Sequence, residues 1–282
     1  MVEVIIPNKK ELENKIKKMS KDGKEKLHVL ADFDNTLTKA FVNGKKTPSV
    51  VAVLRTANYL SEEYSKEANA LAEKYRPIEH DHSIPMVERK KAMFEWWTKH
   101  FELLIRSKLN KNNLKRVIDE GNVEFREGTL DLLDFLHKNK IPLVIMSSSG
   151  IGDLIPMFLE KNKRLYDNIH IITNLYEWDS KGNAIRVKPP VMHIFNKDET
   201  IVKNFPNVYD KIKERKNVIV LGDSIGDLGM IKGFDFDNLI QIGFLNEDTE
   251  KNLNLYKENF DVVITDDGPM DYVNAFLRDL EK

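Results

Sequence analysis

The sequence predicts an α/β fold, in which a doubly wound, mainly parallel sheet carries an inserted α-helical segment. Short apolar runs rich in Val, Ile and Leu recur along the chain, and most are followed by a stretch with helical spacing of apolar residues. Residues 41–124 lack such a β-branched run and show only helical patterns. We therefore expect residues 1–40 and 125–282 to form a Rossmann-like core and residues 41–124 a helical domain.

The elements of the core follow from these patterns. Asn8 and Glu11 predict a capped helix that ends near Asp22 and Gly23. The predicted strands are 27–32, 141–146, 169–173, 218–221, 239–242 and 262–265, and the predicted helices are 128–139, 152–161 and one after each of the last three strands. Residues 180–183, Ser-Lys-Gly-Asn, predict a hairpin turn. Alternating strands and helices predict a parallel sheet that is covered on both faces.

The helical domain is predicted to contain three helices. They span residues 49–75, 86–109 and 111–120, and Pro77 and Pro85 separate the first two.

Composition excludes several classes of function. Lys and Arg number 44 against 45 Asp and Glu, so the net charge is -1 and we expect no nucleic-acid partner. The absence of cysteine excludes disulfides, thiolate metal sites and a cysteine nucleophile, and suits an intracellular protein. Apolar runs such as 143–146 are far too short to span a membrane. We expect a cytoplasmic, monomeric protein with no membrane partner.

Two aspartates, Asp32 and Asp34, follow the first long apolar run. In open α/β sheets the carboxyl ends of the strands form the ligand crevice. Paired carboxylates there suit a hard cation together with nucleophilic or acid/base chemistry. A calcium loop is excluded, because its sixth position would be Leu37 instead of Gly and its twelfth Asn43 instead of Glu. A helix cap or an Asx-turn remains the structural alternative.

Three further polar clusters come later in the chain. Residues 147–150, Ser-Ser-Ser-Gly, follow the strand 141–146, and their hydroxyl and N–H groups could hold a phosphate. Asp223 and Asp227 follow the strand 218–221. Lys188 lies between these clusters, and a surface lysine is its structural alternative. Phosphoryl transfer needs a nucleophile, a cation and donors for the phosphoryl oxygens, and together these clusters supply all three.

In this order the residues resemble the four motifs of the haloacid dehalogenase superfamily of phosphatases. A wider set of segments resembles the cytosolic 5′-nucleotidase III, or pyrimidine 5′-nucleotidase, family. These segments are Asp32-Phe33-Asp34-Asn35-Thr36-Leu37, Asn43-Gly44-Lys45, Pro77-Ile78-Glu79, Glu95-Trp96-Trp97-Thr98-Lys99, Arg126-Glu127-Gly128, Gly150-Ile151-Gly152-Asp153, Phe195-Asn196-Lys197 and Leu221-Gly222-Asp223-Ser224-Ile225-Gly226-Asp227-Leu228.

The resemblance implies distinct roles for the acidic residues. Asp32 would attack phosphorus and form an aspartyl-phosphate, and Asp34 would act as general acid and then as general base. Mg²⁺ would be bound by Asp32, by the main-chain carbonyl of Asp34 and by Asp223. Asp227 would orient water or the lysine from the second shell of ligands.

The resemblance also implies the donors to the phosphoryl group. Lys188 would neutralise its charge, and the spacing before the Phe-Asn-Lys segment favours Lys188 over Lys181 and Lys197. Ser148 would donate to a phosphoryl oxygen with Ser149 beside it, and the additional serine leaves Ser147 as the alternative.

Residues 41–124 would form a cap that closes over the site and binds the leaving group. Glu79 would recognise the base, with a surface salt bridge as its alternative. Trp97 and His100 would form an aromatic wall for the base. The alternative is a packed helical stripe, which would comprise Phe94, Trp97, Phe101 and Leu104. The chain has Ala40 and Phe41 where the family has an aromatic residue, so the base preference is left open.

We therefore expect a magnesium-dependent 5′-nucleotidase that acts on pyrimidine nucleoside monophosphates such as CMP and UMP, or on 7-methyl-GMP. A phosphatase for small metabolites is the alternative with the same core. A catalytically silent phosphate-binding module and a receiver-like signalling module are the non-enzymatic alternatives, and a receiver lacks an insertion of this length.

Overall fold

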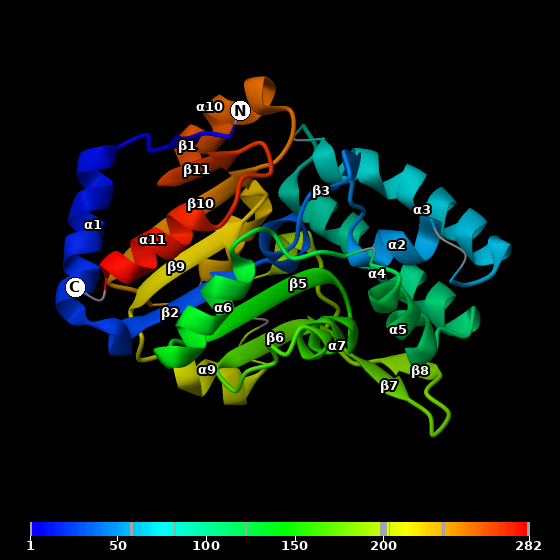
Figure 1. Cartoon of the computed structure of the whole chain (residues 1–282). Helices are drawn as coiled ribbons and strands as arrows, with labels where there is room; N and C mark the ends of the chain where they lie inside the picture. The colour runs from blue at the N-terminus through cyan, green and yellow to red at the C-terminus, as the bar shows by residue number, and fades with distance from the viewer. Residues whose placement is uncertain are drawn as a thin grey trace.

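The computed structural model describes residues 2–56, 59–81, 83–121, 123–197, 202, 204–232 and 235–280. At its centre lies a seven-stranded sheet in the order β1-β11-β10-β9-β2-β5-β6 (Figure 1). The strands are β1 (Val4–Ile5), β2 (Leu27–Ala31), β5 (Leu143–Ile151), β6 (Ile169–Asn174), β9 (Asn217–Gly222), β10 (Asn238–Leu245) and β11 (Val262–Thr265). Every adjacent pair is parallel except β1 and β11. The predicted doubly wound, mainly parallel sheet is confirmed, with β1 as an unpredicted edge strand.

The direction of winding reverses between β2 and β9. From β2 the chain adds β5 and β6 on one side, and then returns to add β9, β10 and β11 on the other. In open α/β sheets ligands bind outside the carboxyl ends of the strands at such a reversal. Asp32 follows β2 and Asp223 follows β9, so the topology alone brings these two carboxylates together.

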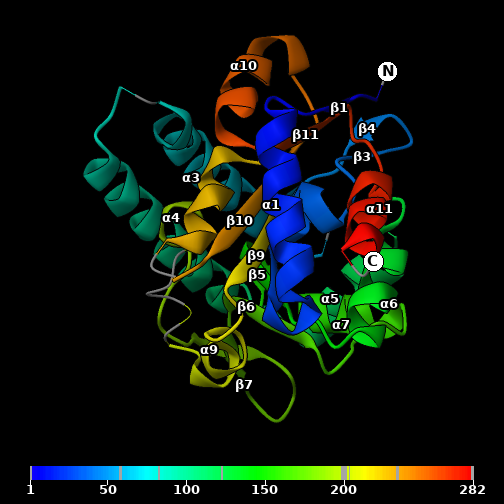
Figure 2. The same cartoon turned by 90° about the vertical axis from the view of Figure 1, so that its left-hand side faces the viewer.

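The alternation of side chains along the strands divides the core into two layers. Val29 and Ile145 pack in one cluster with Leu132 of α6 (Thr129–Lys138), together with residues of α1 (Lys9–Asp22), α7 (Leu154–Lys161) and α11 (Asp271–Asp279). Leu30 and Val144 pack on the opposite face with α9 (Pro206–Ile212). Figure 2 shows α6 and α11 on one side of the sheet and α9 on the other. Helix α10 (Thr249–Asn259) packs through Tyr256 on Leu245 and Val263.

Residues 41–121 contribute no described strand to the central sheet. They form the short hairpin β3 (Phe41–Val42) and β4 (Lys45–Lys46), and the helices α2 (Val50–Thr56), α3 (Glu62–His80), α4 (Met86–Arg106) and α5 (Lys111–Asp119). These helices, hereafter the helical segment, lie beside one end of the sheet (Figure 1). Among the described residues no helix is both long and apolar enough to cross a membrane.

The boundaries of these helices differ from the prediction. The predicted helix 49–75 is two helices, and Ser61 caps the second by accepting a hydrogen bond from the N–H of Tyr64 at 3.2 Å. Positions 57 and 58 of the predicted helix are outside the described residues. Pro77 does not end a helix, because α3 continues through it and its carbonyl accepts a hydrogen bond from Asp81 at 3.0 Å. Pro85 does precede α4, as predicted.

The predicted hairpin turn at residues 180–183 joins β7 (Tyr176–Trp178) and β8 (Ala184–Val187). This hairpin contacts the helical segment, because Asn110 donates to Asn183 Oδ1 at 2.9 Å and Ala184 donates to the carbonyl of Leu109 at 2.8 Å. The helical segment is therefore anchored at α5 as well as by its two chain connections to the core.

Candidate active site

The two aspartates that follow β2 point into different surroundings. The N–H of Asp32 still bonds to the carbonyl of Leu221 in β9 at 3.0 Å, so Asp32 is fixed to the sheet. The chain then turns at Asn35, whose φ of 56° lies in the left-handed region that asparagine tolerates. Asp34 accepts hydrogen bonds from the N–H of Val50 at 3.1 Å and from the Ser149 hydroxyl.

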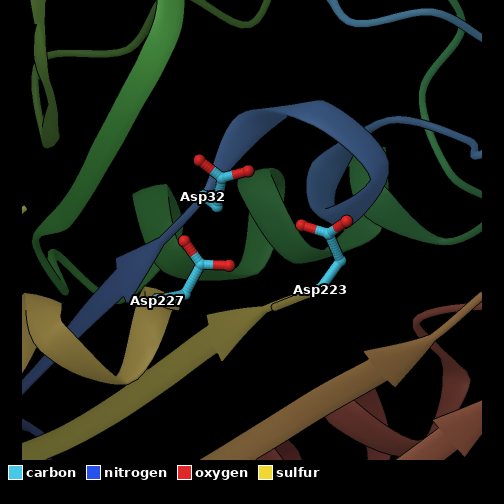
Figure 3. A group of neighbouring side chains, drawn as sticks. All are labelled: Asp32, Asp223 and Asp227. Carbon is cyan, nitrogen blue, oxygen red and sulfur yellow. The ribbon is translucent and has the colours of Figure 1, made fainter. Parts of the chain in front are cut away.

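Asp32 lies in a buried cluster of charges with Lys197, Asp223 and Asp227. Lys197 Nζ donates to Asp32 Oδ1 and, at 2.9 Å, to Asp227 Oδ1. Carboxylate oxygens of the three aspartates all lie within 4.8 Å of one another (Figure 3). Gly222 permits this approach, since a Cβ there would lie 2.5 Å from the Cβ of Asp227. Three acids against one base leave the cluster negative when all are ionised.

Burial and mutual repulsion shift the pKa values of the acidic groups. Burial raises the pKa of Asp32 to about 6, against the opposing effect of Lys197. Burial, together with Asp227 and Asp32, raises the pKa of Asp223 well above its usual value. Burial and the charge of Asp32 raise the pKa of Asp34 to about 7. Burial lowers the pKa of Lys197, but Asp227 and Asp32 outweigh that effect and raise it overall.

The hydrogen bonds of the cluster indicate which acids can accept a cation. Both oxygens of Asp227 are occupied, one by Lys197 and the other by the N–H and hydroxyl of Ser224 at 3.0 and 2.8 Å. Among the described residues, the carboxylate of Asp223 has only a weak contact, 3.5 Å from the Thr36 hydroxyl. Oxygen donors suit Mg²⁺, and a cation would relieve the repulsion that raises the pKa of Asp223. The buried acidic cluster therefore fits a divalent cation at Asp32 and Asp223.

The serine residues lie within β5, whereas the predicted strand ended at residue 146 and placed them after it. Strand β5 runs to Ile151, and α7 begins only at Leu154. The Ser149 hydroxyl bonds to Asp34 and lies 3.4 Å from that of Ser147, whereas Ser148 contributes its carbonyl to a hydrogen bond from Asn174 at 2.9 Å. Because side chains alternate along a strand, the structure brings Ser149 to the aspartates in place of Ser148.

The lysine at the cluster is Lys197, and the prediction of Lys188 for this place was wrong. Lys188 follows β8 on the exposed hairpin, where its charge acts on Glu177. The N–H of Lys188 donates to the carbonyl of Leu175 at 2.7 Å, at the base of the hairpin, and its side chain is exposed. The sequence does contain a signal for Lys197, because the apolar residues Ile194 and Phe195 come shortly before it. They pack against buried residues of α3 and α4, and Lys197 is buried close behind them.

Glu79 lies at the end of α3 and is half-buried. Its main-chain carbonyl accepts a hydrogen bond from Arg89. The guanidinium of Arg89 stacks 4.5 Å from the ring centroid of Phe195, two residues before Lys197. Burial raises the pKa of Glu79, while His80, Arg76 and Arg89 oppose this effect. Arg89 is buried and was not identified from the sequence.

Trp97 and His100 lie in the packed interior of the helical segment and do not form an open wall. They are 9% and 1% exposed, their rings stack at 6.1 Å, and His100 Nε2 lies 3.0 Å from the Tyr64 hydroxyl. The alternative of a packed stripe describes their placement better, with one correction: Phe94 is 51% exposed and is not part of the stripe. Trp96, to which the prediction gave no role, stacks between Tyr75 and Trp97 at 5.9 and 6.0 Å.

Comparison with known proteins identifies the family of the chain. The sequence profile of the pyrimidine 5′-nucleotidase (UMPH-1) family matches residues 35–281. The human 7-methylguanosine phosphate-specific 5′-nucleotidase is 36% identical over 261 residues, which cover 92% of this chain and 86% of the relative.

Two solved structures extend this comparison. Cytosolic 5′-nucleotidase IIIB bound to cytidine is 29% identical, with a TM-score of 0.87, and the match covers 99% of this chain and 93% of the other. A HAD family hydrolase from Salmonella enterica serovar Typhi shares the fold at 16% identity, with a TM-score of 0.56 over 89% of this chain and 70% of its own. The chain belongs to the pyrimidine 5′-nucleotidase family, whose members are phosphomonoester hydrolases.

Proposed function

We propose that this protein hydrolyses nucleoside 5′-monophosphates to nucleoside and phosphate through an aspartyl-phosphate on Asp32. The observation that carries this mechanism is the unequal pair of aspartates. Asp32 is fixed to the sheet and bonded to Lys197, whereas Asp34 bonds to Ser149 and has its pKa raised to about 7. Two neighbouring carboxyl groups with different surroundings suit two different roles.

In the first step a carboxylate oxygen of Asp32 attacks phosphorus, and the bond from phosphorus to the nucleoside O5′ breaks. Asp34 gives its proton to the departing O5′, because its raised pKa keeps much of it protonated near neutral pH. Lys197 lies where negative charge accumulates on the transferring group and donates to its oxygens. Ser149 is the hydroxyl donor beside it.

In the second step water attacks the phosphorus of the aspartyl-phosphate, and Asp34, now ionised, accepts a proton from that water. Phosphate leaves and Asp32 is restored as a carboxylate. Asp227, which bonds to both Lys197 and Ser224, keeps the lysine in position through both steps. Mg²⁺ bound by Asp32 and Asp223, with the Asp34 carbonyl as the expected third protein ligand, would offset the repulsion between carboxylate and phosphate.

The substrate class follows from the relatives and from Glu79. Relatives are named for 7-methylguanosine phosphate, and one is bound to cytidine in its structure. A carboxylate at Glu79 could accept hydrogen bonds from an exocyclic amine or face the cationic 7-methylguanine ring. Trp97 and His100 would support the base-binding face from behind, because both are buried. Residues 41–124, which include the helical segment, would act as the cap that excludes water from the site. A cytosolic location, as in the name of a Caenorhabditis elegans relative, is part of this proposal.

The test is a side-by-side measurement of phosphate release from CMP, UMP, 7-methyl-GMP and ribose 5-phosphate, with Mg²⁺ and with excess EDTA. We expect magnesium-dependent turnover of at least one nucleoside monophosphate and much weaker turnover of ribose 5-phosphate. Equal rates on ribose 5-phosphate and on the nucleotides would instead indicate a phosphatase for small metabolites. Undiminished turnover in EDTA would exclude the metal from the mechanism.

A further inference from the structure

Arg126 is a buried residue to which the proposed mechanism assigns no role. It follows the helical segment directly in the chain and is only 1% exposed. A buried guanidinium is costly unless its donors find partners and its charge is balanced. Its side chain has five partners. Three are main-chain carbonyls: that of Asn35, that of Thr36 at 2.8 Å and that of Gly268 at 2.7 Å. The other two are Asn246 Oδ1 at 2.9 Å and Asp267 Oδ1 at 3.0 Å.

Three of the groups that Arg126 holds are consecutive carbonyls of the turn that carries Asp34. Its side chain bonds to the carbonyls of Asn35 and Thr36, and its own N–H bonds to that of Leu37 at 2.9 Å. Residues 34 and 35 have non-helical backbone angles, so this turn lacks the regular hydrogen bonds of a helix. Arg126, about 90 positions further along the chain, thus supplies the hydrogen bonds that these carbonyls do not find within the turn.

Asp267 joins this arrangement to the start of the helical segment. Its Oδ1 pairs with Arg126 and accepts a hydrogen bond from the N–H of Ala40 at 2.9 Å, and its Oδ2 accepts one from the N–H of Phe41 at 2.9 Å. Residues 40 and 41 are where the chain leaves the core, and Arg126 is where it has returned. Both connections of the helical segment therefore contact the Arg126–Asp267 ion pair.

Asp32 does not depend on this pair in the same way. Its N–H bonds to Leu221 within the sheet, whereas Asp34 lies beyond the end of β2 in the turn that Arg126 holds. Disturbing Arg126 should therefore move Asp34 more than Asp32. A displacement of about 1 Å in a reacting group can cost ~10²-fold in rate.

We propose that Arg126, balanced by Asp267, is a positioning residue that fixes the Asp34 turn and the base of the helical segment as one unit. This inference rests on the proposed role of Asp34 as acid and base. Lysine at position 126 keeps the charge but loses the planar fork that reaches several carbonyls at once.

The experiment is a double-mutant cycle of Arg126→Lys and Asp34→Asn. The values of kcat and KM are measured separately on the nucleotide that the wild type hydrolyses best. We expect Arg126→Lys alone to lower kcat ~10²-fold with KM changed less than about threefold. In the Asp34→Asn background the same change should cost less than about threefold, because the group that Arg126 positions is already lost. Losses that multiply, or an Arg126→Lys protein with wild-type kcat, would overturn the proposal.

Two further variants complete this experiment, one as a matched control and one as a substitute if Arg126→Lys does not fold. Arg164→Lys makes the same exchange in an Arg–Asp pair away from the site, with Asp134 at 2.9 Å, and should retain wild-type kcat. If Arg126→Lys does not fold, Asn246→Ala removes only the side chain that bonds to both Arg126 and the Asn35 carbonyl. It should lower kcat ~10-fold alone and have little effect beside Asp34→Asn; an additive loss counts against the proposal.

The outcome for the proposed function is read separately. Failure of the wild type on every nucleoside monophosphate would refute the proposed substrate class. The cycle would then be run on whichever phosphomonoester the wild type hydrolyses, because the role of Arg126 concerns Asp34 and not the base.

Discussion

The sheet edge and the helical segment, the two ends of the site, are stabilised by different kinds of interaction. At the sheet edge, ionisable groups are fixed by hydrogen bonds from the main chain and from one another, as in the contacts of Asp34, Lys197 and Asp227. In the helical segment, stacked rings predominate, with Trp96 between Tyr75 and Trp97. Directional bonds fix a reacting atom closely, whereas ring packing shapes a surface with looser angular demands. The sheet edge thus suits chemistry, and the helical segment suits recognition.

The largest effect should come from removing either aspartate of the turn. Asp32→Asn should lower turnover by at least ~10⁴-fold, since amide nitrogen and oxygen cannot replace the nucleophile. Asp34→Asn should lower it ~10²–10⁴-fold and should slow breakdown of the phosphoenzyme. Acid-quenched protein from reactions with ³²P-labelled substrate measures the intermediate directly. Label on Asp32→Asn protein would contradict the assigned roles, as would Asp34→Asn protein that turns over at the wild-type rate.

The next effect separates two lysines that the sequence leaves in competition. Lys197→Met should lower kcat ~10²–10³-fold, because it removes the cation beside the transferring group. It also leaves Asp32 and Asp227 without their shared partner, so the melting temperature should fall as well. Lys188→Met is the matched control, since Lys188 is exposed on the hairpin. Steady-state kinetics of both variants decide the matter, and a larger loss for Lys188→Met would refute the placement of Lys197 in the mechanism.

The lysine and the serines show what the sequence can and cannot predict. The strands were predictable because each is a compact apolar run, and their order placed Asp32 and Asp223 at one edge. Asp32, Asp34, Asp223 and Asp227 lie where they were expected because each comes within a few residues of a strand end. Lys197 was not predicted, because the apolar residues Ile194 and Phe195 before it are a weak signal and its position also depends on the path of the β7–β8 hairpin.

The packing of the helical segment was the least predictable part. A helical stripe of aromatic residues is compatible with a core and with a binding wall, and only the tertiary structure shows that Trp97 and His100 are buried. The partners of Arg126 come from three separate parts of the chain, which no spacing rule connects. The choice of Ser149 over Ser148 depended on whether residues 147–149 formed a turn or a strand.

Two buried histidines provide a test of whether the core and the helical segment unfold as one cooperative unit. Burial lowers the pKa of His28 in the core to about 4, and burial with the charge of Arg55 lowers that of His100 in the helical segment to about 4. The unfolded chain therefore binds more protons below its usual histidine pKa, so stability falls as pH decreases from about 6.5 to about 4. Between pH 7.5 and pH 5 each histidine should cost on the order of 2 kcal/mol.

Urea unfolding of wild type and His100→Phe at both pH values measures this effect. Phenylalanine keeps a ring against Trp97 but does not titrate, so the variant should lose less stability on acidification than the wild type. One transition for both proteins would indicate a single cooperative unit. If two transitions appear, the histidine at position 100 should affect only that of the helical segment. An identical pH dependence in both proteins would contradict the assigned burial of His100.

The smallest effect concerns the base, at Glu79. Glu79→Gln keeps the size of the side chain but removes its charge, so it should weaken recognition of a cationic base more than that of a neutral one. We expect kcat/KM for 7-methyl-GMP to fall about tenfold relative to that for UMP, which corresponds to about 1.4 kcal/mol. The rate on ribose 5-phosphate should not change, because Glu79 belongs to the helical segment and not to the charged cluster at the sheet edge. Competition between the two nucleotides in one reaction measures the ratio directly.

Glu73→Gln is the control for this change, since Glu73 lies on the same helix and is exposed. An unchanged ratio for Glu79→Gln would place base recognition elsewhere in the helical segment. A loss of equal size on all three phosphates would mean that Glu79 acts instead on the chemical step, through the Arg89–Phe195 contact that leads to Lys197. The sheet edge and the helical segment would then not have separate roles in chemistry and recognition, because the Arg89–Phe195 contact would couple them.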